Sequence, residues 1–307
     1  MKQRFMAGIG LSALIGGVAR WRGMLTTGGV LGSMVIGTIV FTVGGLAWSA
    51  VVVVFFVSSS LLSRISSERK LRAAADKFSK PGARDLFQTI ANGGVGTFAA
   101  LAYGLLRQRK PGWLQAAFVG AFATATADTW ATEVGTLARS QPRLITTGKS
   151  VPPGTSGGVT WLGTSAALAG GLMLGLTASV TARTISKVGA SSGTGLVAAG
   201  LSGGLFGVLV DSLLGATVQQ VYYCPRCESE TERTIHSCGT RTSRMRGVSW
   251  MENDLVNLLS TAGGAAVAAA TYVLIYQASS SASTATTVSA AHNHRYHRAR
   301  EAEVKLN

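Results

Sequence analysis

Long apolar runs constrain this chain more than any other feature. They lie near residues 5–19, 24–43, 45–62, 88–106, 113–135, 158–181, 192–219 and 254–276. A helix needs about 20 residues to cross a hydrocarbon core of about 30 Å. Several such runs, in a chain with only 13% charged residues, are typical of an integral membrane protein. The first run is short and could be a half-span or an interfacial helix. We therefore predict an all-α integral membrane protein with about seven transmembrane helices, within a range of six to eight.

The N-terminal run follows basic residues, as a signal peptide would. Another apolar segment follows at once, so we interpret it as a first span and keep a cleaved signal as the alternative. Residues 1–278 form the predicted membrane domain, which includes a small Cys/His loop at 222–253. The segment 279–307 is low in complexity and then basic, so we expect a disordered basic tail.

Basic residues are concentrated in the connectors between the apolar runs. The formal net charge is +15. The positive-inside bias places the connectors at 63–85 and 222–254 in the cytoplasm, and the connector at 139–157 then lies on the same side. We expect a bacterial-type cytoplasmic membrane, with the functional site facing the cytosol. Basic connectors also attract anionic lipids or a phosphorylated substrate. We expect no nucleic-acid partner, and homo-oligomerisation stays open.

The direction of successive spans brings distant polar residues to one leaflet. The spans that begin near 113 and 192 both run inward, so Asp128 and Asp211 lie late in each. The outward spans begin beside the amide and acidic residues Asn92, Asn253, Asp254 and Asn257. Intramembrane acids cost about 2.5 to 3.5 kcal/mol each on insertion scales and usually face a polar cavity. We therefore predict a shared polar site at the cytoplasmic boundary.

This set of residues suits Mg²⁺-dependent chemistry on phosphates. Carboxylate and amide oxygens are the ligands that Mg²⁺ prefers, and Lys77, Arg84 and Lys149 could neutralise phosphate oxygens. The alternative is that Asp128 and Asp211 pair with basic residues for assembly or serve a proton pathway. Glu133 lies five positions after Asp128, about 140° around a helix, so we assign it a supporting role or a basic loop partner.

A Gly/Pro-rich loop precedes the span at 158–181. It carries Gly148, Lys149, Ser150, Gly154 and Thr155. Exposed backbone N–H groups beside a helix N-terminus form an anion cradle. The order of residues is not that of a Walker A motif, and an ordinary turn is the alternative.

Four metal-binding side chains lie in the 222–253 loop, at Cys224, Cys227, His236 and Cys238. An odd cysteine count with a Cys-x-x-Cys pair argues against a secreted disulfide framework. Three Cys and one His match a tetrahedral zinc set. We predict a structural zinc site, with reduced unligated thiols as the alternative.

Glycine pairs at a spacing of four recur in three runs, at Gly28 and Gly32, at Gly171 and Gly175, and at Gly203 and Gly207. Such spacing lets helix backbones approach closely. The high glycine content therefore predicts helix packing and does not require a cofactor motif.

Several segments together resemble a known membrane family. They are FFVSSSLLSRISSERK, ANGGVG, ATADTWATEVG, TTGKSVPPGTSGGVT, YYCPRC and SWMENDLVN. The family includes the plant phytyl-phosphate kinase of the vitamin E pathway, and it is similar to the dolichol and phytol kinases. In those kinases an intramembrane Asp, then a Gly, and then a Lys-Ser…Gly-Ser/Thr loop mark the nucleotide-phosphate site. Corresponding positions here are Asp128, Gly135, Lys149, Ser150, Gly154 and Thr155.

The resemblance implies phosphoryl transfer from a nucleoside triphosphate, plausibly CTP, to an isoprenoid monophosphate such as phytyl or geranylgeranyl phosphate. It implies metal-side roles for Asp128, Asp211 and Asp254, with Lys149 on phosphate. Two alternatives stay open. One is a transporter or flippase of an anionic lipid or metabolite, and the other is a lipid cytidylyltransferase.

Overall fold

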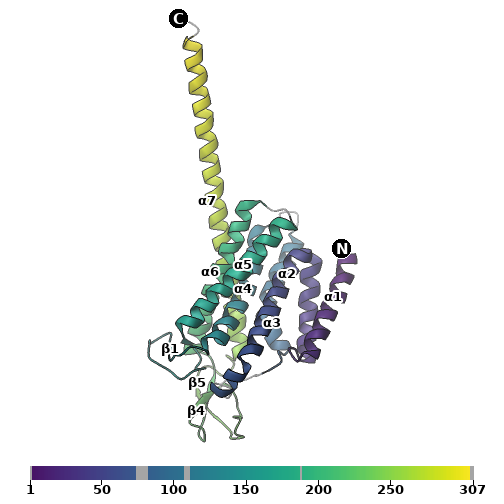
Figure 1. Cartoon of the computed structure of the whole chain (residues 1–307), viewed down its shortest axis with the longest axis vertical. Coiled ribbons are helices and arrows are strands. Elements are labelled where there is room, and N and C mark those ends of the chain that lie inside the picture. The colour runs from purple at the N-terminus through teal and green to yellow at the C-terminus, as the bar shows by residue number, and fades with distance from the viewer. Residues whose placement is uncertain (1, 74–81, 107–110, 187–188, 305–307) are drawn as a thin grey trace.

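The molecule is a bundle of membrane-length helices with a small loop region at one end (Figure 1). This computed structural model describes the backbone of residues 2–73, 82–106, 111–186 and 189–304, and the side chains of these residues except 66–73, 190, 191 and 280–304. Within these ranges the helices are α1 (Lys2–Trp21), α2 (Thr27–Ala73), α3 (Leu86–Leu105), α4 (Gly112–Gly135), α5 (Trp161–Thr184), α6 (Ala190–Thr217) and α7 (Asn253–Val304).

Helix α2 is two helices joined at a sharp break. Gly45 has φ 60° and ψ −152° inside the α2 range, a backbone conformation that glycine adopts without steric cost. Met24, just before α2, and Ser63, late in α2, line the same cavity. The chain therefore reverses direction at Gly45 and crosses the bundle twice. This agrees with the two predicted runs at 24–43 and 45–62.

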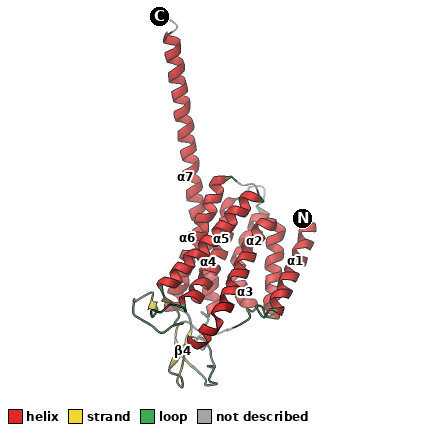
Figure 2. Cartoon of the chain, viewed as in Figure 1, coloured by secondary structure: helices red, strands yellow, loops and turns green. Residues whose placement is uncertain are grey.

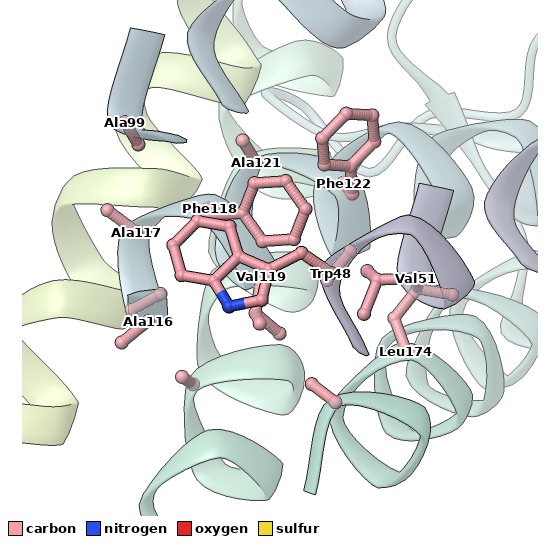
Figure 3. Packing of buried hydrophobic residues seen from close by; sticks show 14 of the residues in the cluster. Trp48, Val51, Ala99, Ala116, Ala117, Phe118, Val119, Ala121, Phe122 and Leu174 are labelled. Atoms are coloured by element: carbon pink, nitrogen blue, oxygen red, sulfur yellow. The ribbon is translucent and has the colours of Figure 1, made fainter. Parts of the chain in front are cut away.

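Helix α4 lies in the middle of the bundle and packs against α2, α3, α5, α6 and α7. Trp48 of α2 packs at a tilt against Phe118 of α4, with ring centroids 4.5 Å apart, and Phe118 meets Phe122 edge to face at 5.1 Å. Figure 3 shows these rings beside the small side chains Ala116, Ala117 and Ala121. Burying α4 on all sides positions its last turns, which carry the polar residues, inside the protein.

Glycines bring α4, α6 and α7 into backbone contact. A Cβ atom at Gly203 of α6 would lie 2.7 Å from the carbonyl oxygen of Gly264 and 2.9 Å from Cα of Gly120. Thr124 Oγ1 donates a 2.9 Å hydrogen bond to the carbonyl oxygen of Gly203. We call Gly120, Gly203 and Gly264 the glycine seam. It confirms the prediction that glycines in these runs serve close helix packing.

The short strands lie in the loops at the end of the bundle where α4 and α6 finish (Figure 2). The strands β1 (Arg143–Leu144) and β2 (Gly158–Val159) form an antiparallel pair. The strands β3 (Val221–Cys224), β4 (Ser229–Thr231) and β5 (Ser243–Arg246) form an antiparallel sheet in the order β4-β3-β5. These two loops follow α4 and α6 directly, so they cover the same end of the bundle.

The predicted apolar runs all coincide with helices, and the helical membrane fold is confirmed. Among the described residues, four segments are long and apolar enough to cross a membrane: Thr27–Ile65, Trp161–Thr184, Ser192–Thr217 and Asn253–Ser279. Helix α7 continues to Val304, through the segment expected to be a disordered tail. Side chains beyond residue 279 lie outside the described set, so disorder there and the domain boundary at residue 278 stay predictions.

Candidate functional site

A polar cavity of about 720 Å³ lies at the loop end of the bundle. Its walls come from helices that are far apart in sequence. The carboxylates that line it are those of Asp128, Glu133, Asp211 and Glu232, the guanidinium groups are those of Arg22, Arg64 and Arg84, and the side-chain amides are those of Gln88, Asn92, Gln219, Asn253 and Asn257. Both signs of charge therefore face one shared volume.

Asp128 and Asp211 occupy matching positions on α4 and α6. Each lies eight residues beyond its own glycine of the glycine seam, at Gly120 and Gly203, or about 12 Å along a helix axis. The two carboxylates interact electrostatically, and Asp211 Oδ2 accepts a 3.2 Å hydrogen bond from the Ser260 hydroxyl of α7. Helices α4 and α6 run in the same direction, as predicted, so the close backbone contact sets both carboxylates at one height.

Glu133 faces the same cavity from the last turn of α4. Its side chain is only 5% exposed, and its Oε1 accepts a 2.8 Å hydrogen bond from the Ser63 hydroxyl of α2. Burial lowers the pKa of the Arg84 guanidinium, while the nearby Glu133 carboxylate raises it. This agrees with the expectation that Glu133 supports a basic loop residue.

Arg84 is held by the backbone on both sides. Its N–H donates to the Met24 carbonyl at 3.0 Å, and its carbonyl accepts from the Thr26 N–H at 3.0 Å. The guanidinium lies over the Phe55 ring, 5.6 Å from its centroid. The segment before α2 and the segment before α3 are thereby joined, and they fix a cation at the cavity wall.

A second, apolar groove of about 100 Å³ adjoins the polar cavity. The groove runs between α1, α2 and α3, with side chains such as Leu11, Val40 and Val53 on its walls. It shares Arg84, Gln88 and Asn92 with the polar cavity. A hydrophobic passage therefore ends at a fixed positive charge.

The Gly/Pro-rich loop divides at its middle. Its second half, from Pro153 to Gly158, lines the cavity. Thr160 caps α5 by accepting a 3.0 Å hydrogen bond from Gly163 N–H, and both residues also line the cavity. Gly154 and Gly157 have positive φ values of 79° and 82°, so this half of the loop turns tightly next to a helix N-terminus.

The first half of the loop lies away from the cavity. Gly148, Lys149 and Ser150 are exposed and are absent from the cavity lining, because the chain turns outward at Gly148, where φ is 68°. Among the residues predicted for the site, Gly154 and Thr155 of this loop line the cavity, and Lys149 does not.

Three amides assigned from sequence, Asn92, Asn253 and Asn257, line the cavity. Asp254 lies between two of them in the first turn of α7 but is not part of the lining. Successive residues of a helix differ by about 100° in direction. Asn253 and Asn257, four positions apart, therefore lie on one face of α7, and Asp254 points away from that face. Lys77 lies outside the described residues.

The Cys/His loop forms a compact cluster. The ligand atoms of Cys224, Cys227, His236 and Cys238 all lie within 4.8 Å of one another. Cys224 is fully buried and His236 is 2% exposed. The side chain and backbone of Thr240, whose hydroxyl lies 3.2 Å from Cys238 Sγ, lower the pKa of that thiol to about 6, whereas the hydrogen bond with Cys238 raises the pKa of the Cys227 thiol to about 11. Three sulfurs and one imidazole are a zinc-binding set, so these four residues could hold one ion.

Polar residues of the cavity lining that sequence reasoning missed include Arg22, Ser63, Arg64, Gln88, Gln219 and Glu232. Glu232 follows β4, and its Oε1 accepts hydrogen bonds from Gln219 Nε2 at 2.7 Å and from Ser156 Oγ at 3.4 Å. Glu232 lies one residue beyond β4, and the neighbouring Glu228 and Glu230 do not line the cavity, so no local pattern in the sequence singles it out.

The fold and the site define a multi-pass helical membrane protein with a polar cavity at one end of the bundle. Residues 10–265 match the family described as integral membrane protein DUF92, and the chain belongs to this family.

Proteins similar to this chain occur in three different organisms. The chain is similar to Protein PGR of Arabidopsis thaliana, with 34% identity over 249 residues that cover 76% of this chain and 84% of the relative. It is also similar to an uncharacterized membrane protein of Methanocaldococcus jannaschii, with 32% identity over 62% of this chain and 74% of the relative. An uncharacterized membrane protein of Synechocystis is 28% identical over 80% and 81%, respectively. No solved structure matches the chain.

Proposed function

We propose that this protein is a membrane-embedded kinase that transfers a phosphoryl group from a nucleoside triphosphate such as CTP to an isoprenoid monophosphate such as phytyl or geranylgeranyl phosphate. The product is the corresponding diphosphate. The observation that carries the proposal is the contact between the apolar groove and the polar cavity through Arg84, Gln88 and Asn92.

This arrangement suits an amphipathic anion. The acceptor's hydrocarbon chain would lie along the groove between α1, α2 and α3, and its phosphate would meet Arg84 in the cavity. A fork of guanidinium donors suits phosphate oxygens. The groove is much smaller than the cavity, so it would take only the part of the chain nearest the phosphate, and the rest would lie in lipid.

The remaining cavity walls suit the donor. The loop from Pro153 to Gly158 and the N-terminus of α5 would bind the triphosphate, because exposed N–H groups and the helix dipole favour anions. Asp128 and Asp211, with the amides of Asn253 and Asn257, would bind Mg²⁺. The ion would neutralise the negative charge on the phosphate oxygens during phosphoryl transfer.

For this reaction the protein mainly has to position the two substrates and neutralise their negative charge. A phosphate monoester oxygen is already an anionic nucleophile at neutral pH. Its attack on the terminal phosphorus forms one P–O bond and breaks the bond to the nucleoside diphosphate, which leaves. Arg84 would hold the acceptor phosphate in line, and the carboxylates would hold the donor's cation. An alcohol acceptor would instead need a general base, for which Asp128 is the candidate.

The test is a product assay with purified protein, radiolabelled CTP and geranylgeranyl phosphate in the presence of Mg²⁺. We expect labelled prenyl diphosphate from wild type and none from Asp128→Asn. Release of pyrophosphate in place of cytidine diphosphate would instead identify a cytidylyltransferase. Lipid flux across vesicles without nucleotide turnover would replace the kinase with a transporter.

A further inference from the structure

We propose that Cys224, Cys227, His236 and Cys238 bind one structural Zn²⁺, and that this ion fixes the loop that holds Glu232 at the wall of the polar cavity. The proposal rests on the geometry of the loop and does not depend on the kinase reaction.

Two distances between ligand atoms are close to the edges of a zinc tetrahedron. Zn–S bonds of about 2.3 Å and Zn–N bonds of about 2.0 Å separate two sulfurs by about 3.8 Å, and a sulfur from a nitrogen by about 3.5 Å. Cys224 Sγ lies 3.7 Å from Cys238 Sγ, and His236 Nδ1 lies 3.3 Å from Cys238 Sγ. Sulfur atoms this close without a disulfide suit coordination to a common ion.

The backbone of the loop is already shaped around the cluster. Glu228 has φ 48° in the turn that follows Cys227, and Gly239 has φ 78° directly after Cys238. Cys227 and Cys238 are thus each followed by a residue in the left-handed region that folds the chain back. His236 N–H donates to the Thr240 carbonyl at 3.0 Å, which closes the second turn. The two turns present their ligands to the same point.

The ring of His236 adds an independent observation. It is 2% exposed, and among the described residues its Nε2 has no hydrogen-bond partner. A buried imidazole is costly unless its nitrogens are used. Nδ1 is the nitrogen that faces the cluster, 3.3 Å from Cys238 Sγ, and a metal bond there would replace the lost hydration of Nδ1 and offset part of the cost of burying the ring.

Glu232 lies between the two halves of the ligand set, five residues after Cys227 and four before His236. Binding all four ligands would close this short segment at both ends and remove most of its conformational freedom. Glu232 Oε1 then accepts from Gln219 at 2.7 Å and reaches Ser156 of the Gly-rich loop. Arg246 adds hydrogen bonds to the carbonyls of Gly215 at 2.8 Å and Ser156 at 3.3 Å. The Cys/His loop is therefore tied to the Gly/Pro-rich loop at the wall of the cavity.

Metal analysis of the purified full-length protein, prepared without chelator and with any affinity tag removed, tests the site. We expect about one zinc per chain for wild type, since four protein ligands close a structural site. The matched control replaces the other three histidines, His292, His294 and His297, by Asn and should keep its zinc. Cys224→Ser and Cys238→Ser should lose it. Wild type that carries no zinc and takes up none on addition would overturn the proposal, whatever the variants do.

Hydrogen–deuterium exchange of wild type, with and without a zinc chelator, tests the positioning of Glu232. We expect faster exchange over 219–246 and over 153–157 after chelation, with α4 unchanged. Faster exchange at 219–246 alone would retain the zinc site and refute its link to the cavity. Both results are independent of kinase activity, so failure of the proposed function would leave this test intact.

Discussion

The Ser63 hydroxyl of α2 donates a 2.8 Å hydrogen bond to the buried carboxylate of Glu133 on α4. This contact joins the second half of α2, which follows the reversal at Gly45, to the last turn of α4 on the wall of the polar cavity. Glu133 also stabilises the charge of Arg84, which stands where the cavity meets the apolar groove. Two helices and one fixed cation are therefore linked through a single carboxylate.

Removing the Ser63 hydroxyl should destabilise the protein. Hydrogen bonds to charged groups contribute about 1.5 to 3 kcal/mol, so Ser63→Ala should lower the free energy of unfolding by about that amount. Ser58, a neighbouring serine of α2, donates a hydrogen bond within its own helix turn, to the Phe55 carbonyl at 3.4 Å. Ser58→Ala is thus the matched control. Thermal unfolding in detergent measures both, and equal effects would contradict the role given to Ser63.

Loss of the charge of Asp128 or of Asp211 should reduce turnover more than loss of the charge of Asp254. Asp128 and Asp211 line the cavity and Asp254 does not. Asp128→Asn and Asp211→Asn should each reduce kcat by about 100-fold or more, the scale of one lost electrostatic contact in a transition state. Asp254→Asn makes the same isosteric change at a residue outside the cavity lining, and it should reduce kcat by less than tenfold. Equal losses in the product assay would restore Asp254 to the metal site.

Narrowing the groove should act on the acceptor and leave the donor alone. Val53 lines the apolar groove. Val57, one turn later on α2, is not part of the lining and has similar exposure, 45% against 37%. Val53→Trp should raise KM for geranylgeranyl phosphate by about tenfold, which corresponds to 1.4 kcal/mol, with KM for the nucleotide unchanged. Val57→Trp should behave as wild type, and a rise in both variants would exclude the groove as the acceptor site.

Adding a methyl group to the glycine seam should be costly. A Cβ at Gly203 would overlap the Gly264 carbonyl and the Gly120 backbone, whereas one at Gly17 of α1 would meet nothing within 4 Å. Overpacking costs about 1 to 3 kcal/mol, so Gly203→Ala should lower stability by that order. Gly17→Ala should be neutral or stabilising by up to about 1 kcal/mol, since alanine is the better helix former. Chemical unfolding in mild detergent compares the two variants.

The features that depend on local pattern were predictable from sequence. Apolar length located the helices, and the alternating direction of spans brought Asp128, Asp211, Asn92, Asn253 and Asn257 to one cavity, because parity needs no knowledge of side-chain contacts. The separation between the runs at 24–43 and 45–62 likewise anticipated the reversal at Gly45.

Features that depend on contacts between distant segments were not predictable. The Gly-rich loop was treated as one anion cradle, but its turn at Gly148 directs Lys149 outward, which only the pairing of β1 with β2 determines. Glu232 reaches the cavity because a sheet orients it, and Ser63 because α2 reverses direction. The apolar groove has no sequence signature, since its walls belong to three helices that each look like ordinary spans.

The glycine seam gives the pair of intramembrane acids an unusual kind of support. The separation of Asp128 from Asp211 is set by three residues that contribute no side chain at all, about two helical turns deeper in the bundle. Any side chain added at the glycine seam would push α4 and α6 apart and so separate the two carboxylates without contacting either of them. The distance across which a shared cation could be held is thus governed by what these positions lack.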